Sequence, residues 1–149
     1  MAWTDCPNCG KGQLVPYTRD EVFDFDLGDG ETVKVCAENV PVVVCNHCEE
    51  LMSGPAAAKI RHEAICRAAG LLAPSEISAL REEIGWSRQH LANLTGIKSA
   101  SIARWEGGQL LQNRGNDTLL KAIRDCPEMR KYLEQQLKEK GRQQTPRPE

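Results

Sequence analysis

The chain has 149 residues, of which 40% are hydrophobic but only seven are aromatic (three Trp, two Tyr and two Phe), and its formal net charge is −2. This length fits one average domain or two small ones, and a small unit with so few large side chains needs a metal or disulfide to supplement its core. The apolar runs are too short to span a bilayer, and the start of the chain has no secretory signal, so we expect a cytoplasmic protein.

The net charge conceals a difference between the two halves. Residues 1–54 carry three basic and ten acidic side chains, whereas residues 55–149 carry sixteen basic and eleven acidic ones. The charges are therefore −7 and +5. This asymmetry predicts different partners, because the acidic half would repel a polyanion such as DNA and the basic half could accept one.

Strand patterns dominate the first segment. In EVFDFDLGDGETVKV (21–35), apolar residues alternate with polar ones on both sides of a GDG sequence. This pattern predicts two strands joined by a tight turn. The stretch VPVVVC (40–45) predicts a third strand, and Pro41 would place the start of that strand at a sheet edge.

Two CxxC pairs enclose these strands, Cys6 with Cys9 and Cys45 with Cys48, and 35 residues separate the pairs. Seven cysteines cannot all pair as disulfides, and a reducing cytosol favours metal binding. Structural zinc prefers four tetrahedral thiolates, so we predict one zinc per chain on these four residues. A closed four-sulfur shell has no position for water or substrate, which indicates a structural metal. Iron stays an alternative, because four thiolates also bind it.

The other cysteines and His47 are weaker candidates for metal ligands. A complete four-cysteine shell leaves no vacancy for His47. We expect Cys36 to be a spare thiol, and Cys66 and Cys126 to be small packing residues in helices. A redox dithiol needs a single CxxC in a βαβ setting, and the sequence shows no such setting.

Helical patterns fill the rest of the chain. Residues 55–70 predict a linker helix that begins at Pro55, ends at Gly70 and joins a zinc-binding domain (1–54) to a helical domain (71–140). The helical domain should contain five helices, and the polar residues 141–149 should form a disordered tail. The predicted fold class is therefore α+β. The expected start signals of the five helices are Ser75, Ser87, Ser99, Asn116 or Asp117, and Pro127.

The stretch SRQHLANLTGIKSASIARWEGG (87–108) has the layout of a helix-turn-helix. Gly96 would form the turn, and Ile102 and Trp105 would anchor the second helix in the core. The outward residues of such a helix read base edges in the major groove, whereas Gln89 suits a phosphate contact and Glu106 suits a structural salt bridge. The alternative is a helical bundle with a solvated face. The candidate DNA contacts are Arg88, Gln89, Lys98, Ser99, Ala100, Ser101 and Arg104.

Together and in this order, the two motifs resemble the MqsA-type antitoxins of type II toxin–antitoxin modules, in which a YgiT-type zinc finger precedes an Xre-type helix-turn-helix. The resemblance implies a zinc domain that contacts a toxin, typically a small RNA-cleaving protein with a basic surface. It also implies a C-terminal domain that dimerises and binds operator DNA. Arg104 matches the family, whereas Ala100 stands where the family can use a polar base-reading residue. The matching stretches are CPNCGKG, NVPVVVCNHCEE, LREEIGWSRQHLANLTGIKSASIARWEGG, TLLKAI and PE.

We therefore expect an antitoxin and autorepressor that binds a palindromic operator as a homodimer and has no enzymatic activity. One rival is a stand-alone Xre-family regulator without a toxin partner. The other is a metal-dependent redox or hydrolytic enzyme, which the closed Cys₄ set and the scattered His47, His62 and His90 disfavour. A small basic reading frame beside the gene would favour the antitoxin over the stand-alone regulator.

Overall fold

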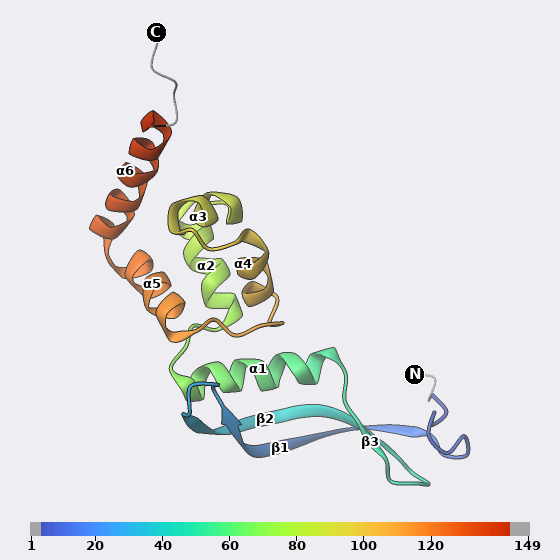
Figure 1. Cartoon of the computed structure of the whole chain (residues 1–149). Coiled ribbons are helices and arrows are strands. Elements are labelled where there is room, and N and C mark those ends of the chain that lie inside the picture. Colours follow the sequence, from blue (N-terminus) through green and yellow to red (C-terminus); the bar gives the residue numbers. More distant parts are fainter. Residues whose placement is uncertain (1–3, 144–149) are drawn as a thin grey trace. The chain divides into compact units, whose positions relative to one another are not determined.

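The computed structural model describes residues 4–143 and divides into two compact units, Met1–Gly70 and Leu71–Glu149 (Figure 1). The first unit is an antiparallel sheet with one helix, and the second contains helices only in its described part. This arrangement confirms the α+β class. Between residues 4 and 143, none of the helices has the length and apolar character that crossing a bilayer would require.

The sheet has the order β1-β2-β3, with β1 at Leu14–Asp26, β2 at Thr32–Cys45 and β3 at Leu51–Met52. The predicted hairpin is present, because β1 and β2 pair from Asp26↔Thr32 to Leu14↔Cys45. Gly28 and Gly30 both have φ +86° in the connecting turn, a conformation that glycine adopts without a steric penalty.

The stretch VPVVVC is not a separate third strand, as the sequence pattern had predicted, but the end of the 14-residue β2. The chain does not turn before this stretch. Instead, β2 has one extra residue near Asn39, which appears as a register shift between Arg19 and Glu21 of β1. Asn39 has φ +53° and donates its N–H to the Asp20 carboxylate at 2.9 Å. Pro41 thus lies inside the central strand, where β3 does not reach it, since β3 pairs only with Val43 and Val44.

The helix α1 (Pro55–Ala69) lies over one side of the sheet in the first unit (Figure 1). It begins at Pro55 and ends at Gly70, as predicted, and Gly70 has φ +70°. It is not a separate linker, because it packs on β2 and its alanines permit a close approach to the sheet. The buried apolar side chains of the sheet and of α1 include Val35, Ala37, Val40, Val42, Ala57, Ala64 and Ile65.

The second unit contains α2 (Pro74–Ile84), α3 (Arg88–Thr95), α4 (Ser99–Glu106), α5 (Arg114–Asp125) and α6 (Pro127–Gln143). These five helices enclose one apolar core. Met129, Leu133 and Leu137 of α6 pack against that core as partly buried side chains. Its buried members are Leu72, Ile77, Leu80, Trp86, Leu91, Ala92, Leu94, Ile102, Trp105, Leu120 and Ile123.

Some helix starts differ from the predicted ones. Ser87 caps α3 as expected, because its side chain accepts the His90 N–H at 3.0 Å. In contrast, α2 begins one residue before Ser75, and Ser99 is the first residue of α4 rather than its cap. Similarly, α5 begins before Asn116 and Asp117, because the side chain of Asn113 accepts the Asn116 N–H at 2.8 Å and becomes the N-cap.

The C-terminal predictions also need correction. Cys126 is exposed in the junction between α5 and α6 and is not a packing residue, whereas Cys66 is buried as predicted. The helix α6 continues to Gln143, so the first three residues of the predicted disordered tail 141–149 are helical. Gly141 does not stop the helix, since one glycine costs only about 1 kcal/mol and helix-forming side chains surround it. Residues 144–149 lie outside the described part of the chain.

Candidate functional site

The two CxxC pairs form knuckles with the same backbone geometry. In the first knuckle, the Gly10 N–H donates to the Cys6 carbonyl at 2.8 Å, and in the second the Glu49 N–H donates to the Cys45 carbonyl at 3.1 Å. Gly10 and Glu49 occupy equivalent positions and have φ +62° and +60°. Glu49 thus adopts a left-handed conformation that normally favours glycine, because the turn requires it.

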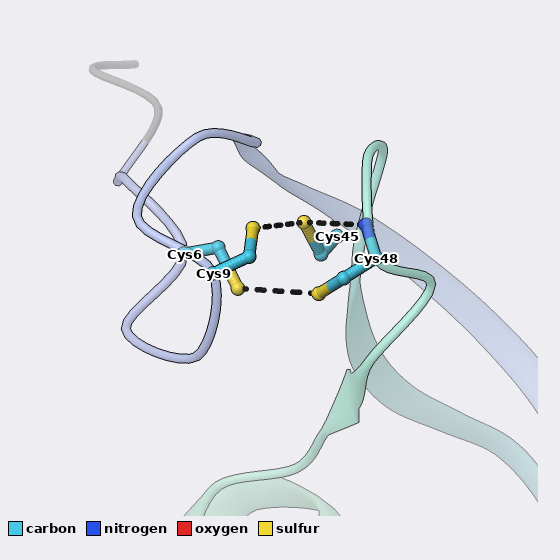
Figure 2. Close-up of side chains that lie close together, drawn as sticks. All are labelled: Cys6, Cys9, Cys45 and Cys48. Atoms are coloured by element: carbon cyan, nitrogen blue, oxygen red, sulfur yellow. Dashed lines mark hydrogen bonds between the residues drawn. The ribbon is translucent and has the colours of Figure 1, made fainter.

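The four sulfur atoms face one another between the knuckles (Figure 2), and all of them lie within 4.8 Å of one another. The Sγ atoms of Cys6 and Cys48 are 3.7 Å apart, as are those of Cys9 and Cys45. A tetrahedron with Zn–S bonds of about 2.3 Å has S–S edges of about 3.8 Å, so the cluster fits zinc. The chain therefore has one structural zinc site, made of Cys6, Cys9, Cys45 and Cys48.

Backbone N–H groups stabilise the thiolates that zinc requires. The Cys48 and His47 N–H groups both donate to Cys45 Sγ at 3.4 Å, and they lower the pKa of Cys45 to about 6. The N–H groups of Lys11 and Gly12 likewise lower the pKa of Cys9. In Cys9 and Cys45, these donors favour the thiolate, which binds metal, over the thiol.

Gly12 is a site residue that sequence analysis did not single out. A Cβ atom there would lie 2.3 Å from Cys45 Sγ and 2.7 Å from His47 Cβ, so only glycine fits. The signal in the sequence was the glycine three residues after Cys9. His47 is exposed and, like Cys36, is not part of the sulfur cluster that the described residues form.

The second candidate site is the pair α3 and α4, which a short turn joins. Gly96 has φ +78° and donates its N–H to the Ala92 carbonyl at 2.9 Å, so it ends α3 as predicted. Ile102 and Trp105 are buried, which fixes α4 against the core. The prediction that Ile102 and Trp105 of α4 face the core is therefore confirmed.

The outward face of α4 and its N-terminus is basic. Lys98, Ala100 and Arg104 are exposed, whereas Ser99 and Ser101 are half-buried. Within residues 4–143, no carboxylate forms an ion pair with Lys98 or Arg104. On α3, the exposed Gln89 donates to Asn93 Oδ1 at 2.9 Å. The positive charges on α4 are thus available to an anionic partner.

Glu106 is the structural salt-bridge partner that the sequence predicted. Its side chain is 2% exposed, and it accepts hydrogen bonds from Arg81 Nε at 2.8 Å and from Arg88 Nε. The Glu106 carboxylate raises the pKa of Arg81, so this guanidinium remains charged. Sequence analysis missed the role of Arg81, because 25 residues separate it from Glu106.

Comparison with known proteins gives one family. The sequence model of the family described as "Antitoxin component of bacterial toxin-antitoxin system, MqsA" matches residues 4–134, which include both the zinc site and the α3–α4 surface. No curated protein matches the chain.

Proposed function

Because the chain belongs to the MqsA family of antitoxins, we propose that it represses its own operon through α3 and α4 and neutralises a toxin through its zinc-holding unit. The two activities would then reside in the two compact units, Met1–Gly70 and Leu71–Glu149. The zinc is structural and the chain is not an enzyme, since the four-sulfur site leaves no position for a substrate.

The exposed basic face of α4 carries the proposal of DNA binding. Lys98 and Arg104 project from a helix that Ile102 and Trp105 fix to the core. A recognition helix in a helix-turn-helix needs both features: a rigid backbone that sets its depth in the major groove, and side chains free to contact bases. Arg104 is the residue best suited to guanine, and Ser99 and Ser101 can bond to either partner of a base pair. Ala100 can contribute only apolar contact.

The phosphate contacts would come from the start of α3. Arg88 and Gln89 are the first two residues of this helix and are exposed. Backbone N–H groups at a helix N-terminus also favour phosphate. Base reading by α4 and phosphate binding by α3 would together fix the register of the protein on DNA.

We further propose a homodimer that binds a palindromic operator, with half-sites about one helical turn apart or a multiple of it. In the sequence, Met129, Tyr132, Leu133 and Leu137 form an apolar stripe that suits either a dimer surface or core packing. Met129, Leu133 and Leu137 pack on the core, and Tyr132 is exposed by 58%. Tyr132 is thus the member of this stripe that can take part in a dimer contact.

The toxin would bind to the acidic first unit. Its sheet has an outer face, turned away from the buried side chains, on which Asp24, Asp26 and Glu38 are exposed. Val22 lies on the same face opposite Cys36 and is 64% exposed. An apolar centre with acidic neighbours suits a partner with a basic surface.

The DNA-binding proposal is tested with a duplex that contains the region upstream of the chain's own gene. Arg104→Ala should weaken binding by roughly 1–3 kcal/mol and relax base preference at one position of each half-site. Gln89→Ala should weaken binding to all sequences alike, as expected for a phosphate contact. Arg67→Ala, which removes an exposed arginine from α1 of the other unit, is the matched control. An unchanged affinity and base preference in Arg104→Ala would refute the proposed interface.

The toxin proposal is tested with the adjacent reading frame. If that frame encodes a small basic protein that arrests growth, co-expression of residues 1–70 should restore growth and the two proteins should co-purify. A chain that binds its upstream DNA but has no such neighbour would instead be the stand-alone Xre-family regulator.

A further inference from the structure

Glu106 and Arg88 are placed so that a buried acid orients an exposed base. The Glu106 side chain is 2% exposed, whereas that of Arg88 is 51% exposed. The contact uses Arg88 Nε, so it holds the guanidinium by its inner edge. The two terminal Nη groups of Arg88 have no hydrogen-bond partner among residues 4–143. The first residue of α3 therefore presents two N–H donor groups to the solvent in a fixed orientation.

The Glu106 carboxylate accepts hydrogen bonds from two arginines. Oε1 accepts from Arg81 Nε at 2.8 Å, and Oε2 accepts from Arg88 Nε and, at 3.4 Å, from Arg81 Nη2. Arg81 is 14% exposed and also donates to the Trp86 carbonyl at 3.0 Å, so it is fixed inside the unit. Arg88 is the arginine that faces outward, and it is the one that a DNA phosphate could reach.

We propose that Glu106 is a positioning residue for DNA binding: it holds Arg88 so that its Nη groups clamp one backbone phosphate per protomer. This inference rests on the proposed DNA binding. It assigns to an acidic residue a favourable role in binding a polyanion. The reason is orientation: an arginine fixed before binding loses less side-chain entropy when it meets the phosphate than a free arginine does.

This role predicts that removing the charge of Glu106 changes the affinity for DNA in the direction opposite to the usual one. Removing a negative charge close to a DNA-binding surface ordinarily strengthens binding, because repulsion from the phosphates falls. Here the removal should weaken binding, because Arg88 loses its anchor. Glu106→Gln is the sharpest change, since it removes the charge and replaces one accepting oxygen with an NH₂ group, which cannot accept a hydrogen bond from an arginine. The less exposed Arg81 should keep the remaining oxygen and leave Arg88 unanchored.

The experiment measures the affinity of the full-length, zinc-loaded protein for two duplexes across a range of salt concentrations. One duplex contains the region upstream of the gene, and the other is a random sequence. Glu106→Gln should weaken binding to both by about tenfold, and the slope of log K against log salt should become shallower by about 1 per protomer, as for one lost phosphate contact. Glu83→Gln removes an exposed acid from α2 and is the matched control; it should bind DNA equally well or slightly better.

Introducing Glu106→Gln into an Arg88→Ala protein distinguishes the positioning of Arg88 from a general effect of Glu106 on the fold. Arg88→Ala alone should reproduce the loss of affinity and the change of slope. Adding Glu106→Gln to it should then cause no further weakening, because the anchored group is already absent. In the free wild-type protein, the Arg88 Nε–H resonance should be protected from exchange with water, and Glu106→Gln should remove that protection.

Three results would overturn the inference. The first is a Glu106→Gln protein that binds DNA as tightly as the wild type or more tightly. The second is a loss that is equally large in the Arg88→Ala background, which would mean that Glu106 acts through Arg81 and the fold. The third is a wild-type protein without salt-dependent DNA binding, which would refute the proposed function as well. The first two leave wild-type binding intact, so failure of the inference alone is distinguishable.

Discussion

Gly12 shows how little space the zinc site leaves around its ligands. A side chain there would collide with Cys45 Sγ, the sulfur that accepts two backbone N–H groups. Neither Cys45 nor the opposing knuckle can move away without loosening the four-sulfur shell. The size of one residue therefore limits the affinity of this site for metal.

We predict that Gly12→Ala weakens zinc binding roughly 5- to 150-fold, which corresponds to the 1–3 kcal/mol that overpacking typically costs. Competition with a chromogenic chelator measures the affinity. Gly54→Ala is the matched control, because its Cβ would meet no atom within 4 Å and its φ is −115°. Equal zinc affinities of the two variants would show that the knuckle tolerates the added methyl group.

Glu21 is the residue that ties α1 to the sheet. Its carboxylate accepts from Arg61 Nε at 2.7 Å and Nη2 at 2.9 Å, and from Arg19 Nε at 3.0 Å. The hydrogen bonds from Arg61, followed by those from Arg19, lower the pKa of Glu21 from its usual 4.5 to about 2. The ionised form of Glu21 is therefore favoured in the folded state.

The pKa shift of Glu21 sets a pH dependence. Since the pKa in the folded state lies below that in the unfolded state, the stabilisation is fully present above about pH 4.5 and is lost as the pH falls towards 2. Glu21→Gln should lower the free energy of unfolding by on the order of 1–3 kcal/mol at pH 7, by the same amount at pH 5, and by less below pH 4.5. Urea unfolding of the zinc-loaded protein measures the difference. Glu38→Gln, which replaces an exposed acid on the opposite face of the sheet, is the control and should show no such pH dependence. A loss of stability in Glu21→Gln that does not vary with pH would contradict the ion-pair mechanism.

At the scale of helices, α5 is anchored by a buried acid rather than by the cap that the sequence suggested. Asp117 is 3% exposed and accepts the Leu72 N–H at 2.8 Å and the Gln112 side-chain amide at 3.1 Å. Gln112 in turn donates to the Leu72 carbonyl at 2.8 Å. The segment that precedes α2 is thus fixed to the start of α5.

We predict that Asp117→Ala destabilises the helical unit by about 1–3 kcal/mol, because it leaves the buried Leu72 N–H without a partner. Asp125→Ala on the same helix removes an exposed acid that pairs with Arg124, and such pairs contribute only about 0–1 kcal/mol. Thermal unfolding followed by circular dichroism compares the two variants. Similar midpoints in both would show that the buried hydrogen bonds of Asp117 contribute little.

At the scale of the whole molecule, the two units depend on different forces. The first has a small apolar core and a metal site, whereas the second has a contiguous core from five helices. Metal binding contributes on the order of 10 kcal/mol to the folding of small zinc domains, whereas residues 71–143 of the helical unit contain no cluster of metal-binding side chains.

Removal of zinc by a strong chelator should therefore unfold the first unit and leave the second one folded. Amide hydrogen exchange should increase over residues 4–70 and stay unchanged over 71–143. DNA binding should persist under the same conditions, and toxin capture should be lost. Cys45→Ser, which removes a ligand directly, should reproduce this state without a chelator. Loss of protection throughout the chain would show that the units fold together.

The sequence alone determined the features that depend on short-range pattern. The CxxC spacing, the Gly28–Gly30 turn, the Ser87 cap and the spacing of Ile102 and Trp105 each specify a local geometry within a few residues. Their physical causes act between near neighbours in the chain: φ preferences, capping hydrogen bonds and helical periodicity. These features can therefore be predicted from the sequence.

Only the tertiary structure decided features that join distant segments. The continuation of β2 through Pro41 depends on a bulge in β2, where Glu38 and Asn39 lie opposite Asp20 of β1, and the packing of α1 on the sheet depends on Arg61 reaching Glu21. Asp117 became a buried acceptor instead of a cap because Leu72, 45 residues away, supplies its donor. Likewise, Glu106 connects Arg81 with Arg88 only because α2, α3 and α4 pack around it. Burial and long-range hydrogen bonding outweigh local propensities of a few tenths of a kcal/mol to about 1 kcal/mol, and they are fixed only when the chain has folded.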